Sequence, residues 1–92
     1  MTTDELHQLR CRMDAINLRL CAVLEERAQL CRAIGAWKQL HGVAMADPAR
    51  ETAMLTLLLQ HAGTGFDAKA LARILRLVFD ESRAIVMRAT TS

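Results

Sequence analysis

Two basic side chains lie where the sequence predicts the apolar face of a long helix. Arg27 occupies the one gap in a stripe whose members, at steps of three and four, are Leu6, Leu9, Met13, Ile16, Leu20, Val23, Leu30, Ile34 and Trp37. Lys38 follows about three turns later and so projects within roughly 20° of Arg27. A guanidinium on a buried seam stays charged and needs an anion beside it. Glu25 and Glu26 do not lie on this seam, so the spacing predicts an anionic ligand for both cations.

Each candidate residue also has an explanation that requires no ligand. Arg27 can pair with a carboxylate of another helix, and Lys38 near a helix C-terminus favours the macrodipole. Asp47 suits a helix N-cap, and Arg50 and Glu51 suit a solvated first turn after it. The residue types and their spacing leave both interpretations open.

The composition indicates an all-α protein with a single domain over residues 1–92. Hydrophobic residues make up 52% of the chain and aromatic residues only 3%, with many Leu, Ala and Arg. A net charge of +2, with signs that alternate along the chain, argues against nucleic acid as a partner. No apolar run is long enough to cross a membrane.

Neither a metal site nor a cofactor site is expected. The three cysteines are ten residues apart and form no CxxC pair, which favours reduced thiols in a cytoplasmic protein. The three histidines have no ligand spacing, and no nucleophile–base pair or glycine-rich phosphate loop is present. Residues 1–5 lack the basic start and apolar run of a signal peptide.

The first predicted helix is too long for a domain of this size to enclose. Thr2 and Glu5 form a capping-box signature, so the helix is expected to begin near Thr3 and to continue until Gly42. Such a helix is roughly 55 Å long, whereas a compact domain of this size is only about 30 Å across. The far half of its apolar stripe must then be covered by another subunit, which predicts an intertwined homodimer. Arg10 lies about 100° around the helix from Arg27, so the two cannot serve one pocket from the same chain.

Two shorter helices are predicted to follow. Asp47-Pro48 is a strong start signal for a helix that ends near Ala62-Gly63. Asp67 caps a third helix that is expected to run to about Arg88, with Phe66 packing on Leu71 as a hydrophobic staple and residues 89–92 frayed. Ser82 interrupts the apolar face of the third helix, where its hydroxyl can return to a carbonyl one turn back.

Six short motifs occur in a specific order along the three predicted helices. They are Leu9-Arg10, Met13-Asp14-Ala15-Ile16-Asn17, Leu24-Glu25-Glu26-Arg27, Ile34-Gly35-Ala36-Trp37-Lys38, Asp47-Pro48-Ala49-Arg50-Glu51 and Asp80-Glu81-Ser82. Together they resemble the all-helical (AroQ-type) chorismate mutase family. That family is a homodimer of three-helix subunits in which the first helix spans both active sites, in agreement with the length argument.

The resemblance implies a reaction and a role for each cation. The family catalyses the Claisen rearrangement of chorismate to prephenate, which needs no nucleophile, metal or cofactor. By position, Arg10 of the partner chain and Arg27 would hold the substrate carboxylates, with Arg50 close behind them. Lys38 would bond both a carboxylate and the ether oxygen, where negative charge develops as the C–O bond breaks.

The resemblance also implies the contacts of the substrate ring. Glu51 and the backbone at Asp47 would take the ring hydroxyl, and Ser82 would take the ring carboxylate. One turn after Ser82 the family usually has a glutamine or glutamate that donates to the ether oxygen, whereas this sequence has Val86. The loss of one such donor typically costs about 10²–10³ in rate.

Three hypotheses follow from this departure. We expect a chorismate mutase, because Glu51 and the set of Arg10, Arg27 and Lys38 are intact. The second hypothesis is a related activity on a similar substrate, either isochorismate pyruvate lyase or 4-amino-4-deoxychorismate mutase. The third is a weakly active helical dimer that is stimulated by a partner enzyme, such as the first enzyme of the shikimate route.

Overall fold

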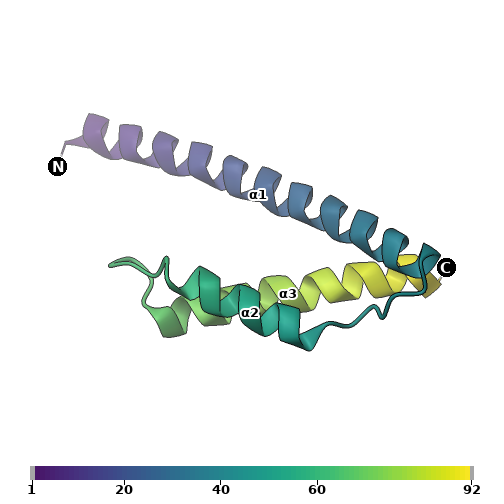
Figure 1. Ribbon diagram of the computed structural model, residues 1–92. Coiled ribbons are helices and arrows are strands. Elements are labelled where there is room, and N and C mark those ends of the chain that lie inside the picture. The colour runs from purple at the N-terminus through teal and green to yellow at the C-terminus, as the bar shows by residue number, and fades with distance from the viewer. Residues whose placement is uncertain (1, 92) are drawn as a thin grey trace. The chain divides into compact units, whose positions relative to one another are not determined.

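The structure is all-α, as predicted. A computed structural model describes the backbone of residues 2–91 and the side chains of residues 2–89. Its three helices are α1 (Thr3–Leu40), α2 (Pro48–Leu59) and α3 (Ala68–Thr91) (Figure 1). Two compact units make up the chain, Met1–Leu30 and Cys31–Ser92, and α1 contributes residues to both.

The first unit consists of the N-terminal stretch of α1. The predicted capping box is present: the Thr2 amide donates to Glu5 Oε2 at 3.2 Å, and the Glu5 amide donates to Thr2 Oγ1 at 3.1 Å. The apolar stripe remains at least 39% exposed at each position in this unit, namely at Leu6, Leu9, Met13, Ile16, Leu20, Val23 and Leu30. Its apolar residues are therefore spaced as predicted, and this chain leaves them uncovered.

A glycine ends α1 at the predicted place. Gly42 has a φ of 67°, in the left-handed region that glycine adopts without a steric penalty. The Val43 amide then donates to the Lys38 carbonyl oxygen at 2.9 Å, which is the long bond of a Schellman motif. The last turn of α1 is thereby closed, and Lys38 lies within it.

The second helix begins as predicted but ends early. Asp47 Oδ1 accepts a hydrogen bond from the Arg50 amide at 3.0 Å, with Pro48 at the first helical position. The helix ends at Leu59 and not near Ala62, because the next three amides donate to carbonyls only three residues back. These tighter bonds convert the expected last turn of helix into a turn that leads to the third helix.

The third helix extends beyond its predicted end. Asp67 caps it as expected, since its Oδ1 accepts a hydrogen bond from the Ala70 amide at 2.8 Å. Phe66 is 58% exposed, so a staple on Leu71 covers little of its ring. The helix continues past its predicted end near Arg88 as far as Thr91, whereas the fraying of residues 89–92 stays a prediction. Ser92 lies outside the described residues.

The core of the second unit lies along α3. Phe79 and Ala72, seven residues apart and therefore on one face, are the buried apolar side chains among the described residues, at 3% and 6% exposure. The helices α2 and α3 pack side by side (Figure 1). Gly35 of α1 is also buried. This small core lies where α2 and α3 pack together within the second unit.

Candidate active site

The side chain of Lys38 makes one long contact with the connection between α1 and α2. Its ammonium is half-buried, and Nζ donates to the Met45 carbonyl oxygen at 3.4 Å. A backbone carbonyl carries no net charge, so this contact orients the ammonium without neutralising it. The predicted positive group therefore stays available to an anion at the end of α1.

Gly35 brings α1 close to α3 one turn before Lys38. A Cβ atom built on Gly35 would lie only 2.7 Å from Val86 Cγ1 and 3.5 Å from the Met45 methyl carbon. Val86 thus packs directly on the backbone of α1, and Met45 lies beside it. A glycine inside a helix is destabilising compared with alanine, but here the missing Cβ allows this close approach.

Substitution of Gly35 by alanine is expected to lower the free energy of unfolding by about 1–2 kcal/mol, the overpacking cost less the gain in helix propensity. In a Val86→Ala background the same substitution is expected to be neutral or stabilising, because the methyl group that it would meet is gone. Denaturant unfolding of the four proteins in this double-mutant cycle gives the coupling. Equal losses in both backgrounds would contradict the contact.

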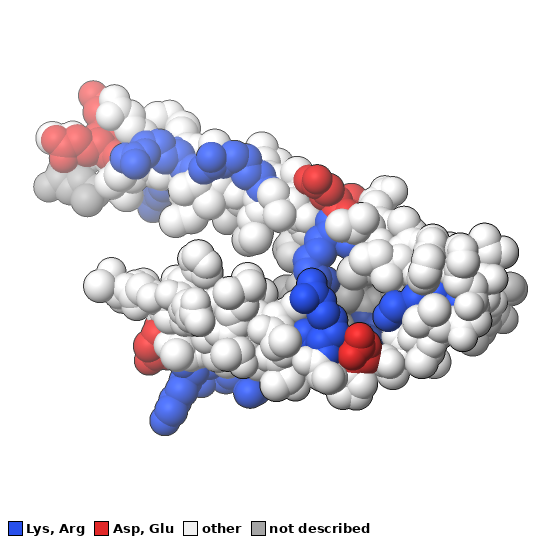
Figure 2. Space-filling model, viewed as in Figure 1, with Lys and Arg blue, Asp and Glu red and all other residues white. Residues whose placement is uncertain are grey.

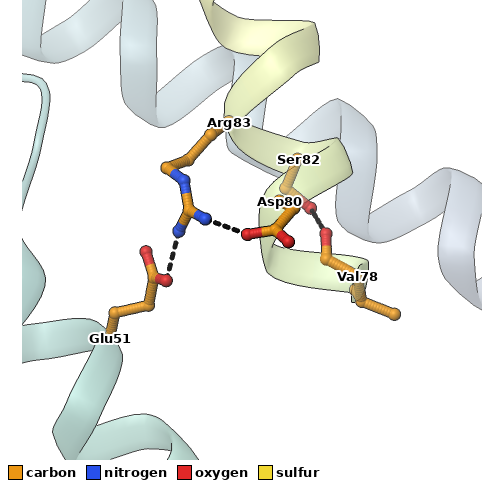
Figure 3. A network of polar contacts seen from close by, with 5 residues as sticks. All are labelled: Glu51, Val78, Asp80, Ser82 and Arg83. Atoms are coloured by element: carbon orange, nitrogen blue, oxygen red, sulfur yellow. Dashed lines mark hydrogen bonds and ion pairs between the residues drawn. The ribbon is translucent and has the colours of Figure 1, made fainter. Parts of the chain in front are cut away.

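Glu51 forms an ion pair that the sequence analysis did not predict. Arg83 Nη1 donates to Glu51 Oε1, and Arg83 Nη2 donates to Asp80 Oδ1 (Figure 3). The hydrogen bond to Glu51, together with the charges of Glu51 and Asp80, raises the pKa of Arg83. Glu51 lies on α2, whereas both other residues lie on α3. The carboxylate predicted to meet the ligand is therefore already paired with a cation of the same chain.

The remaining candidates of the second unit have local structural roles. Asp47 caps α2, and its carbonyl oxygen accepts the Glu51 amide at 3.1 Å. The Arg50 side chain is exposed. Ser82 Oγ donates to the Val78 carbonyl oxygen at 2.6 Å, as its ligand-independent explanation required (Figure 3). The ligand contacts predicted for these residues stay predictions.

The other two predicted cations lie in the first unit. Arg10 is exposed, and Arg27 has intermediate exposure. Their convergence on Lys38, and the contribution of Arg10 from a partner chain, stay predictions. Figure 2 shows both basic and acidic side chains on the face that it presents. Within residues 2–91, no group of three or more histidine, cysteine or acidic side chains could hold a metal ion.

Residues 9–87 match the family model of chorismate mutase type II. The chain belongs to the chorismate mutase type II family. The match includes all six motifs of the sequence analysis and every candidate residue from Arg10 to Val86. Among the residues that the structure describes, no helix of this chorismate mutase domain is long and apolar enough to span a membrane.

Two solved structures resemble this chorismate mutase domain closely. The chorismate mutase from Helicobacter pylori in complex with prephenate is 26% identical, with a TM-score of 0.85 over 97% of each chain. The form II structure of the chorismate mutase from Thermus thermophilus is also 26% identical, with a TM-score of 0.85 over 91% of this chain and 96% of that chain. The all-α fold with a long first helix is shared with enzymes of the family.

A curated relative acts on a different compound. The 4-amino-4-deoxychorismate mutase of Streptomyces pristinaespiralis is 42% identical over 48 residues, which cover 52% of this chain. This chorismate mutase domain spans only 37% of that relative's length.

Proposed function

We propose that this chain catalyses the rearrangement of chorismate to prephenate as a homodimer with two shared active sites. The observation that carries the proposal is its likeness over 97% of both chains to a chorismate mutase that holds prephenate. The match of residues 9–87 to the family, with Lys38 and Glu51 inside it, supports the same activity. We further propose that this chain acts in the cytoplasm.

The proposed chemistry needs positive charge and a fixed substrate conformer. In the rearrangement the ether C–O bond breaks while a C–C bond forms within the same molecule, so no side chain has to act as a nucleophile. Arg27 and the partner's Arg10 would clamp the carboxylates in the reactive conformer, with Arg50 behind them. Lys38 would bond a carboxylate and the ether oxygen, whose developing charge it stabilises.

The proposed contacts of the ring require one rearrangement of a hydrogen bond. Glu51 and the backbone at Asp47 would take the ring hydroxyl. Ser82 donates its proton to the Val78 carbonyl oxygen, so it would have to exchange this bond for one to the ring carboxylate. Val86 supplies no donor, and we therefore assign the ether oxygen to Lys38.

The homodimer is supported by the exposed stripe of α1. Side chains from Leu6 to Leu30 at helical spacing are uncovered in this chain, and monomeric soluble proteins rarely expose so long an apolar surface. A second copy would cover the stripe and bring its own Arg10 with it. Light scattering on the purified protein should give twice the mass of 10.2 kDa. A monomer would refute both the dimer and the shared site.

The activity is tested by product analysis with three substrates. The purified protein is incubated with chorismate, isochorismate and 4-amino-4-deoxychorismate, and loss of absorbance and the products are measured. Prephenate from chorismate supports the proposal, whereas free pyruvate would identify a lyase. Preference for the amino compound would favour the second candidate function, for which the Streptomyces pristinaespiralis relative is the observation.

The Val86→Gln variant is expected to raise kcat for chorismate by about tenfold or more, because the amide adds a donor to the developing charge on the ether oxygen. Val86→Met serves as the control, since it lengthens the side chain without adding a donor. The measurement is the initial rate of chorismate loss at saturation. A lower rate for the glutamine variant than for the methionine variant would indicate that Val86 is matched to other chemistry.

A further inference from the structure

The contact with Arg83 places a positive charge beside Glu51, which is one of the hydrogen-bond acceptors of the proposed site. Arg83 lies between two carboxylates, one on α2 and one a turn earlier on its own helix (Figure 3). Asp80 anchors the guanidinium on α3, and the guanidinium reaches Glu51 Oε1 across the α2–α3 contact. Glu51 therefore meets a ligand as half of an ion pair.

A paired carboxylate still accepts hydrogen bonds but attracts cations less strongly. Arg83 occupies one oxygen of Glu51, and a carboxylate has about four acceptor positions on its two oxygens. A neutral hydroxyl can thus still donate to Glu51. An ammonium at the same place would be attracted by Glu51 and repelled by the guanidinium beside it, so that much of its advantage over a hydroxyl is lost.

We propose that Arg83 is a positioning residue that sets the substrate specificity of this site, favouring a ring that carries a hydroxyl opposite Glu51 over one that carries an ammonium. This inference rests on the proposed function and on the contact of Glu51 with the ring substituent. The two compounds that it separates are chorismate and 4-amino-4-deoxychorismate, which differ in that single group. Arg83 acts only through Glu51 and need not touch the substrate.

The charge of Arg83 does more here than stabilise the fold. The Arg83 and Glu51 side chains are 49% and 34% exposed, and exposed ion pairs contribute little to stability. Without the guanidinium, however, Glu51 and Asp80 would both be left uncompensated, and the local charge would change from −1 to −2. A cationic ring substituent would gain from this change, whereas a neutral one would not.

The test compares kcat/KM for chorismate and for 4-amino-4-deoxychorismate in the wild type and in three variants of Arg83. Arg83→Gln and Arg83→Ala remove the charge, and Arg83→Lys keeps it. We expect both neutral variants to shift the ratio of the two kcat/KM values about tenfold toward the amino compound. The lysine variant should keep the ratio of the wild type within about twofold, because it restores the charge.

The ratio separates a specificity role from a structural one. A loss of folded protein lowers both kcat/KM values equally and leaves their ratio unchanged. Arg76→Gln, which removes a charge from an exposed residue of α3 two turns before Arg83, is the matched control and should keep the wild-type ratio. A shift of equal size in this control would overturn the inference, since any lost charge would then suffice.

The outcomes also separate the inference from the proposed function. If the wild type converts chorismate and all variants keep its ratio, the specificity role of Arg83 is refuted and the activity stands. If the wild type converts neither compound, the proposed function fails and the inference fails with it. A tenfold shift in the neutral variants, with the lysine variant unchanged, supports both.

Discussion

Replacement of Lys38 by alanine is expected to lower kcat/KM for chorismate by about 10³-fold. Removal of a single uncharged donor to a developing oxyanion costs about 10²–10³ in rate. In the proposed site, the Lys38 ammonium brings a full positive charge to the ether oxygen and also contacts a substrate carboxylate. One turn after Ser82, Val86 supplies no hydrogen-bond donor. It therefore cannot compensate for the loss of the Lys38 ammonium at the ether oxygen.

The fold should tolerate this change. Lys38 donates to one carbonyl oxygen at 3.4 Å, a long bond, and its charge near the C-terminus of α1 is worth about 0.3–1 kcal/mol. Thermal unfolding followed by circular dichroism should therefore show a small shift. Lys69→Ala is the matched control, because Lys69 is the chain's other lysine and is exposed in the first turn of α3. If Lys38→Ala keeps activity within about tenfold of the wild type, Lys38 does not stabilise the transition state.

Mixing two inactive variants is expected to restore activity if each site takes Arg10 from one chain and Lys38 from the other. Arg10→Ala and Lys38→Ala homodimers should each be inactive. A heterodimer of the two has one site with both residues intact and one site that lacks both. Unfolding and refolding an equal mixture should therefore recover about a quarter of the wild-type rate, since half of the dimers are heterodimers with one working site.

The control for this experiment uses Arg27 and Lys38, which the proposal takes from the same chain in each active site. Arg27→Ala mixed with Lys38→Ala leaves every site of the heterodimer with one defect, so this mixture should stay inactive. Chorismate loss is measured before and after mixing, and heterodimers are identified by a tag on one variant. Heterodimers that form from Arg10→Ala and Lys38→Ala without recovering activity would refute the exchange of Arg10.

The sequence predicted those features whose partners are near in the chain. The Thr2–Glu5 capping box and the Asp47 and Asp67 caps each join residues three positions apart, and Gly42 supplies a backbone conformation by itself. Such interactions depend on local geometry, which a short sequence segment specifies. The helix starts, the all-α class and the uncovered stripe of α1 could for that reason be predicted without coordinates.

Tertiary structure alone decided which distant side chains meet. The Asp80–Arg83 spacing is visible in the sequence, but the helical period shows only that a residue faces a certain way and not which residue faces it. Arg83 reaches Glu51 across 32 positions, and Val86 meets Gly35 across an even longer stretch of chain. Both contacts depend on how α1, α2 and α3 pack within the second unit, because packing and not local propensity brings such pairs together.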